Sequence, residues 1–185
     1  MGVDRPRRNA AGHRLASARH EPSHWSVSDL SVRVETAPVE LKPLLRPLLT
    51  DYLVEFAEME GVAPQYDADG QATYRYFDDY WTDAARVPFA VWLGAGLVGF
   101  CLLRDAGDRW EIAEFYVAPD QRRRGVGAAV VDAVKRYCRA IGRHRLLEAS
   151  TLRFNTGAYA FWSSQGFVTE SETPRRLINV SDLGG

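Results

Sequence analysis

Three β-rich runs between residues 88 and 118 lead directly into a glycine pair and an amphipathic helix. The runs are separated by "GAG" (94–96) and "DAGD" (105–108), which are hairpin signals, so they predict an antiparallel meander. Helical spacing then predicts a helix over 125–141, between a strand at 110–118 and a strand at about 144–151. A strand-helix-strand unit inside a mostly antiparallel sheet indicates a mixed α/β (α+β) domain.

The remaining segments complete one domain. Alternation near residue 30 predicts a first strand, and 39–60 predicts a helix that starts late or is kinked at Pro43 and Pro47. The aromatic-rich segment 67–87 predicts a second, shorter helix with irregular ends. A helix at about 155–165 and two short strands follow. We expect residues 1–29 to be a disordered leader and 30–185 to be a single domain.

Composition excludes several classes of function. The chain has 185 residues, 46% of them hydrophobic, which suits one substantial core. A net charge of -1 gives no global attraction to nucleic acid, and no apolar run is long enough to span a membrane, so neither partner is expected. Cys101 and Cys138 lie in apolar segments, which predicts reduced thiols and a cytoplasmic location. The four histidines share no ligand spacing, so no metal site is expected.

The glycine pair in "QRRRGVGAAV" (121–130) admits several interpretations. A P-loop requires Lys-Ser or Lys-Thr after its last glycine, and the chain contains neither dipeptide. A dinucleotide fingerprint requires a third glycine where Val130 stands, and the meander upstream is wrong for that fold. A tight turn alone accounts for Gly125. It does not account for three arginines beside the first turn of a helix, which together predict a site for a pyrophosphate.

Two motifs resemble the GCN5-related N-acetyltransferases (GNAT). "VAPDQRRRGVG" (117–127) is similar to the R/Q-x-x-G-x-G/A signature, and "NTGAYAFWSSQGF" (155–167) is similar to N-x-x-A-x-x-F-Y-x-x-x-G-F. Their order, their separation and the meander extend the resemblance over roughly 30–180. It implies a mostly antiparallel mixed sheet of six to seven strands with flanking helices. It also implies that the fourth and fifth strands splay like a V around acetyl-coenzyme A.

The resemblance implies which residues hold this co-substrate. Backbone N–H groups of the loop at 122–127 would bind the pyrophosphate, and the pantetheine arm would pair with the fourth strand. No metal is implied. The expected cofactor-binding residues are Phe115, Tyr116, Val117, Arg122, Arg123, Arg124, Gly125, Val126, Gly127, Ala128, Asn155 and Trp162.

Acetyl transfer to an amine requires a group that takes the amine proton. Glu114 and Glu111 on the fourth strand are candidates, as is Glu148 on the fifth, and a water relay is an alternative. Strand alternation places Glu111 and Glu114 on opposite faces unless a bulge intervenes, so we expect at most one of them to face the acetyl group.

The catalytic acid is the main departure from the family pattern. Many members have Tyr where this chain has Trp162, and an indole N–H is not a usable acid near neutral pH. Tyr159, one helical turn earlier, is the predicted substitute if it points toward the sulfur. A thiolate is also a fair leaving group without an acid.

These features predict an acetyl-CoA-dependent N-acetyltransferase that acts on a primary amine of a small molecule or peptide. The alternative is a catalytically inactive coenzyme A-binding module that serves as a sensor or partner-binding domain. Because GNAT proteins commonly dimerise, the resemblance also allows a homodimer. An acidic substrate entrance suited to a cationic amine is a further hypothesis, and it rests on Asp67, Asp69, Asp78, Asp79 and Asp83.

Overall fold

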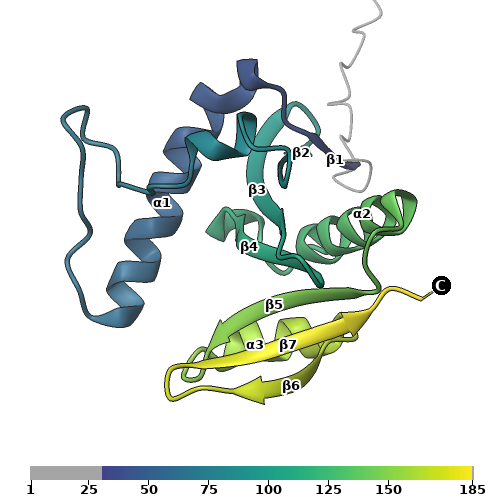
Figure 1. The fold of residues 1–185 in the computed structure, drawn as a ribbon. Coiled ribbons are helices and arrows are strands. Elements are labelled where there is room, and N and C mark those ends of the chain that lie inside the picture. The colour runs from purple at the N-terminus through teal and green to yellow at the C-terminus, as the bar shows by residue number, and fades with distance from the viewer. Residues whose placement is uncertain (1–30, 185) are drawn as a thin grey trace, which may run out of the picture.

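The fold is a seven-stranded sheet in the order β1-β2-β3-β4-β5-β7-β6 (Figure 1). The computed structural model describes residues 31–184, so the predicted leader at 1–29 lies outside the described residues. Every neighbouring pair is antiparallel except β4–β5, which is parallel. The strands are β1 (Val32–Thr36), β2 (Arg86–Leu93), β3 (Gly96–Asp105), β4 (Trp110–Val117), β5 (Leu146–Leu152), β6 (Val168–Glu172) and β7 (Arg176–Asp182).

Within the described residues, three α-helices flank the sheet. They are α1 (Lys42–Glu60), which follows a short 3-10 turn at Val39–Leu41, α2 (Val126–Ile141) and α3 (Thr156–Ser164). Pro43 stands in the first turn of α1, where a missing N–H costs little, and Pro47 lies one turn further on. None of the helices in residues 31–184 has the length and apolar character needed to cross a membrane.

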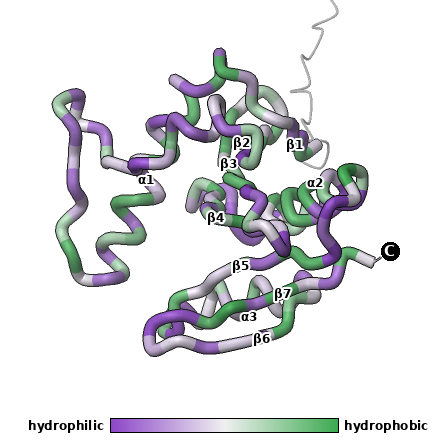
Figure 2. The backbone as a smooth tube through the Cα atoms, viewed as in Figure 1, coloured by the Kyte–Doolittle hydropathy of each residue, from purple (hydrophilic) through white to green (hydrophobic). Residues whose placement is uncertain are grey.

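The helix predicted within 67–87 is wrong. The helical structure in this segment is limited to a 3-10 turn, η3 (Asp78–Trp81), and the loop before it is mostly hydrophilic (Figure 2). The Asp67 carboxylate accepts hydrogen bonds from the backbone N–H groups of Asp69 and Gln71, and Gly70 adopts a φ of 73°. These bonds close a tight turn in place of the first turn of a helix, because Asp side chains compete for backbone N–H groups.

Each face of the sheet has its own core. Helices α2 and α3 cover one face, where Val130, Val134 and Trp162 pack on the strands. Helix α1 and η3 cover the opposite face, here called the α1 face, where Leu45 and Leu49 pack among buried strand residues. Figure 1 shows α1 and α2 on different sides of β3 and β4. Side chains of successive strand residues therefore enter different cores, which fixes the register of the sheet.

The β4–β5 pair is short. Only Trp110–Ile112 pairs with Leu147–Ala149, although β4 continues to Val117 and β5 to Leu152. On its other side, β4 pairs Glu114 with Leu102 and Ile112 with Leu103, so Ala113 is an extra residue. This β-bulge begins where the β4–β5 pairing ends, and it bends β4 away from β5. The V-shaped splay between the fourth and fifth strands is thus confirmed.

Two glycines of β3 provide a matched test of this packing. A Cβ on Gly99 would stand 2.3 Å from the carbonyl oxygen of Tyr116 on β4, whereas a Cβ on Gly96 would meet nothing closer than 3.6 Å. We expect Gly99→Ala to lower the free energy of unfolding by about 2 kcal/mol or more. In thermal unfolding this corresponds to a fall of about 4–8 °C in the Tm. Gly96→Ala should change the Tm little, and equal losses in both variants would contradict this account.

Candidate active site

The splay opens a cleft of about 660 Å³ between β4 and β5. Residues of α1, α2 and α3 also line it, so it is bounded by all three helices and both diverging strands. Val126 and Arg124 are not among its lining residues, because Val126 is buried in the core and the Arg124 guanidinium donates to Gln121. The predicted residues that line the cleft are Phe115, Tyr116, Val117, Arg122, Arg123, Gly125, Gly127, Ala128, Asn155 and Trp162.

The N-terminus of α2 opens into this cleft. Gly125 caps the helix with a φ of 80° and provides no side chain, and its carbonyl accepts the N–H of Ala129. The N–H groups of Val126, Gly127 and Ala128 precede that bond and have no acceptor within the helix. Unpaired N–H groups and the helix dipole favour an anion at this position. The loop therefore fits the pyrophosphate of coenzyme A.

The two signature glycines act differently. A Cβ on Gly125 would meet nothing within 4 Å, so glycine is needed there for its left-handed backbone conformation. A Cβ on Gly127 would stand 3.0 Å from the Phe161 ring, which stacks on Phe115 at 5.6 Å between centroids. Gly127 thus allows α2 to approach α3 and β4 closely.

Arg122 connects α1 to the loop at 122–127, which is called the phosphate loop below. Its Nε donates to the Val117 carbonyl at 2.8 Å, and its two terminal nitrogens contact the Glu55 carboxylate at 2.8 and 2.6 Å. Arg123, whose own φ is 62°, makes no side-chain hydrogen bond or ion pair within residues 31–184. Sequence reasoning missed Glu55, because no spacing links a helix residue to a loop 67 positions later.

Asn155 caps the N-terminus of α3. Its Oδ1 accepts the N–H of Ala158 at 2.9 Å, and its Nδ2 lies 3.6 Å from the sulfur of Met59. The amide nitrogen can therefore donate a hydrogen bond into the cleft, whereas the amide oxygen is already engaged.

The bulge places both candidate bases of β4 on one face. Glu111 pairs with Arg104 and Glu114 with Leu102, and those partners are two residues apart on β3. Since Leu102 packs in the core under α1, both glutamates lie on the α1 face. Simple strand alternation would place the two glutamates on opposite faces. The bulge at Ala113 intervenes and places them on the same face.

The three candidate carboxylates have different partners. Glu111 Oε2 accepts hydrogen bonds from Nε and Nη2 of Arg104 at 2.9 and 2.5 Å. Glu148 Oε2 lies 3.4 Å from Nη1 of Arg109. Glu114 makes no ion pair within residues 31–184. It accepts a hydrogen bond of 2.5 Å from the Tyr52 hydroxyl instead. A proton acceptor needs an available lone pair, so this environment favours Glu114.

Burial raises the pKa of Glu114, and hydrogen bonds from Tyr52 and Tyr74 oppose the rise. Burial and the Glu114 charge raise the pKa of Tyr52, which therefore remains a protonated donor. A raised carboxylate pKa is characteristic of general bases that work near neutral pH. Sequence reasoning did not connect either tyrosine with Glu114. Tyr74 lies in the aromatic-rich segment 67–87, whereas Tyr52 lies in the helix predicted over 39–60.

Trp162 and Tyr159 lie in different environments. Trp162 is 6% exposed, lines the cleft and packs edge-on against Phe115 at 5.3 Å. Tyr159 is 40% exposed and is not among the lining residues. The structure does not bring Tyr159 to the cleft, so its geometry gives the predicted acid role no support.

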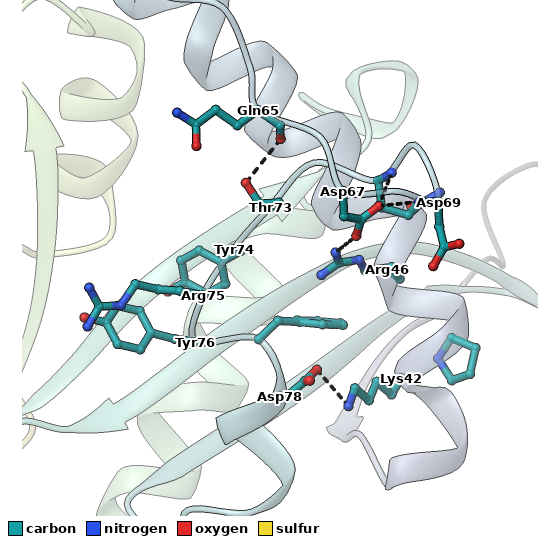
Figure 3. Close-up of a pocket in the computed structure, with 13 residues that line it drawn as sticks. Lys42, Arg46, Gln65, Asp67, Asp69, Thr73, Tyr74, Arg75, Tyr76 and Asp78 are labelled. Atoms are coloured by element: carbon teal, nitrogen blue, oxygen red, sulfur yellow. Dashed lines mark hydrogen bonds and ion pairs between the residues drawn. The ribbon is translucent and has the colours of Figure 1, made fainter.

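A second hollow of about 1040 Å³ lies between α1 and residues 65–78 (Figure 3). Two of its three acidic side chains have cationic partners, and the third is Asp69. Asp67 lies 2.7 Å from Arg46, and Asp78 lies 2.8 Å from Lys42. The predicted acidic entrance is therefore largely neutralised at these positions. In the described residues, no cluster of three potential metal ligands occurs either.

Comparison with known proteins identifies the family. The profile described as "Acetyltransferase (GNAT) family" matches residues 49–167, which include β2–β5, all of α2 and α3, and most of α1. The chain belongs to the GNAT acetyltransferase family. No curated protein sequence matches it significantly.

Solved GNAT structures share the fold at low identity. The ribosomal-protein-S18-alanine N-acetyltransferase of Escherichia coli has a TM-score of 0.64 and 13% identity, with 84% of this chain and 96% of that chain covered. PaiA N-acetyltransferase from Thermoplasma acidophilum, in complex with coenzyme A, has a TM-score of 0.63 and 12% identity, with 83% of this chain and 99% of that chain covered. An aminoglycoside 6'-N-acetyltransferase complexed with coenzyme A has a TM-score of 0.62 and 14% identity, with 83% of this chain and 98% of that chain covered.

The environment of Glu114 generates a prediction about stability. Because its folded-state pKa is raised, the charge destabilises the folded GNAT domain as pH rises through that pKa. Glu114→Gln removes the charge and keeps an oxygen that can accept from Tyr52. We expect a Tm above wild type at pH 8 and a smaller difference at pH 4, measured by thermal unfolding.

Glu111→Gln is the control for this experiment. It removes the ion pair to Arg104 and should give no gain in Tm at pH 8. A Glu114→Gln difference that is independent of pH would contradict the assignment of a raised pKa.

Proposed function

We propose that this protein is an acetyl-CoA-dependent N-acetyltransferase that acetylates a primary amine of a small molecule or peptide. The observation that carries the proposal is Glu114, a partly buried carboxylate with no ion pair in the described residues. It is not itself a lining residue of the cleft, but it is held by Tyr52 and lies between Ala113 and Phe115, all three of which line it. Family membership supports acetyl transfer, and the coenzyme A complexes of two solved relatives support the donor. The acceptors named for two relatives, a ribosomal protein and an aminoglycoside, support an amine.

The donor would be held by the phosphate loop and the free edge of β4. The N–H groups at the start of α2 would bind the pyrophosphate, with Arg123 beside them. Beyond Ile112, β4 has no strand partner on its β5 side, which leaves backbone groups of Ala113–Val117 for the pantetheine arm. Acetyl-CoA would supply the acetyl group as a thioester, which is activated toward amines.

Glu114 would act as the general base. The amine nitrogen forms a bond to the acetyl carbon, its proton passes to the Glu114 carboxylate, and the carbon–sulfur bond breaks to release a thiolate. Tyr52 and Tyr74 hold the carboxylate in place through hydrogen bonds. The proton would reach the carboxylate directly or through a relay water. The thiolate leaves without a side-chain acid, and Trp162 forms part of the apolar wall of the cleft.

Removing the base should lower turnover. We expect Glu114→Gln to reduce kcat by about 10²- to 10⁴-fold and to abolish the acidic limb of the pH profile of kcat/KM. That limb should lie above the ordinary glutamate range, because activity is lost as pH falls through a raised pKa. Thiol release from acetyl-CoA with a panel of primary amines provides the measurement.

Two control variants accompany this assay. Glu111→Gln and Tyr159→Phe should retain most of the activity, since Glu111 is bound to Arg104 and Tyr159 lies outside the cleft. Wild-type activity in Glu114→Gln would reject Glu114 as the base. Acetyl-CoA binding without turnover across the panel would instead favour the inactive module.

Coenzyme A binding can be tested at the two ends of α2. Gly125 and Gly142 both have a positive φ, 80° and 66°, so Ala should strain the backbone similarly at either position. Only Gly125 lies at the phosphate loop. We expect Gly125→Ala to weaken coenzyme A binding by about tenfold or more in calorimetric titration, and Gly142→Ala to leave it near wild type. Equal affinities in the two variants would count against the site.

A further inference from the structure

Arg176 differs from the other partly buried arginines. It has no carboxylate partner within residues 31–184, although its side chain is only partly exposed to solvent. A partly buried guanidinium normally has an anionic partner, because removing charge from water is costly. The other partly buried arginines of the described chain each form an ion pair with Asp or Glu, and they are Arg46, Arg86, Arg104 and Arg109.

The position of Arg176 directs it toward the candidate active site. It is the first residue of β7 and pairs with Leu152 of β5. Ser150 lies two residues before Leu152 on β5, and Glu148 lies four residues before it. By alternation these side chains share the α1 face with Glu114. The guanidinium carbon stands 5.7 Å from the centroid of the Phe56 ring, and Nη1 stands 3.5 Å from Ser150 Oγ. Phe56 and Ser150 both line the cleft.

Arg176 also acts electrostatically on the base. Burial raises the pKa of Glu114, and the positive charge of Arg176 opposes that rise. A cationic acceptor that approached Glu114 would encounter this charge as well. An acceptor that brought its own anionic group would neutralise Arg176 while its amine faced Glu114.

We propose that Arg176 binds a carboxylate of the acceptor, so that the acceptor is an amine with a carboxylate in the same molecule, such as an amino acid. The planar guanidinium matches a carboxylate with two parallel hydrogen bonds, and its packing on Phe56 holds it in place. The proposal rests on the proposed N-acetyltransferase function. It differs from the cationic acceptor that the aspartates suggested, and three of those five aspartates, Asp67, Asp78 and Asp83, already have cationic partners.

The test compares acids with their amides in the 185-residue chain. Thiol release is measured with the twenty L-amino acids and with the corresponding amino-acid amides as acceptors. We expect kcat/KM for the best acids to exceed that of their amides by about 10- to 100-fold, chiefly through KM. Arg176→Gln should remove this preference and leave the KM for acetyl-CoA unchanged. O-Phosphoethanolamine serves as a separate arm, because a phosphate would also suit a guanidinium.

Arg175→Gln is the matched control, because Arg175 is the exposed neighbour whose guanidinium contacts Glu60. It should keep the preference for acids. The proposal would be overturned if the ratio of kcat/KM for acids to kcat/KM for amides were the same in wild type and Arg176→Gln. This holds also if the substitution changed only the pH profile. A preference for O-phosphoethanolamine over every amino acid would also overturn it.

A second measurement separates this proposal from the proposed function. The Tm of the protein is measured in the presence of coenzyme A and either N-acetyl-amino acids or the corresponding N-acetyl-amino-acid amides. These are the products of the proposed reaction, so their binding requires no turnover. The acids should raise the Tm of wild type more than the amides do, and should lose this advantage in Arg176→Gln. Acids and amides that act alike would reject the role of Arg176, whatever the thiol assay shows. Binding of the acids without any thiol release would reject the N-acetyltransferase function alone.

Discussion

The extra residue Ala113 in β4 is the constraint on which the site depends. A parallel pair of strands would ordinarily continue to share hydrogen bonds for as long as both strands extend. Here the pairing ends at Ile112 and Ala149, and the bulge that follows leaves one edge of β4 without a strand partner. That edge, the start of α2 and the helix α3 then enclose a cleft. The same bulge moves Glu114 onto the α1 face, where Tyr52 holds it.

Charge pairing distinguishes the acidic residues of this sheet. Glu111 and Glu148 lie beside arginines that keep their carboxylates occupied, whereas Glu114 is supported by neutral hydroxyl groups. Hydroxyl partners orient a carboxylate and leave it able to accept a proton. Arg176 is the complementary case, because it is a partly buried cation without a carboxylate partner among the described residues. The proposed acceptor supplies a partner to each.

Local sequence patterns predicted much of this architecture. The meander, the helix after Gly125 and the splay follow from hairpin signals, helical spacing and the family motifs. Patterns failed where a side chain replaced a backbone bond, as at Asp67, whose carboxylate closes a turn within a predicted helix. They also could not reveal long-range partners. The contact between Tyr52 and Glu114 joins residues 62 positions apart, and the bulge at Ala113 has no signature of its own.

The central claim is that the splay between β4 and β5 forms the coenzyme A site. It is tested most directly by following backbone amide resonances of the ¹⁵N-labelled protein during titration with coenzyme A. We predict that the largest shifts occur in residues 113–117 on β4 and 125–128 at the start of α2. Shifts concentrated in residues 65–78, around the hollow beside α1, with β4 and α2 unchanged, would contradict the account.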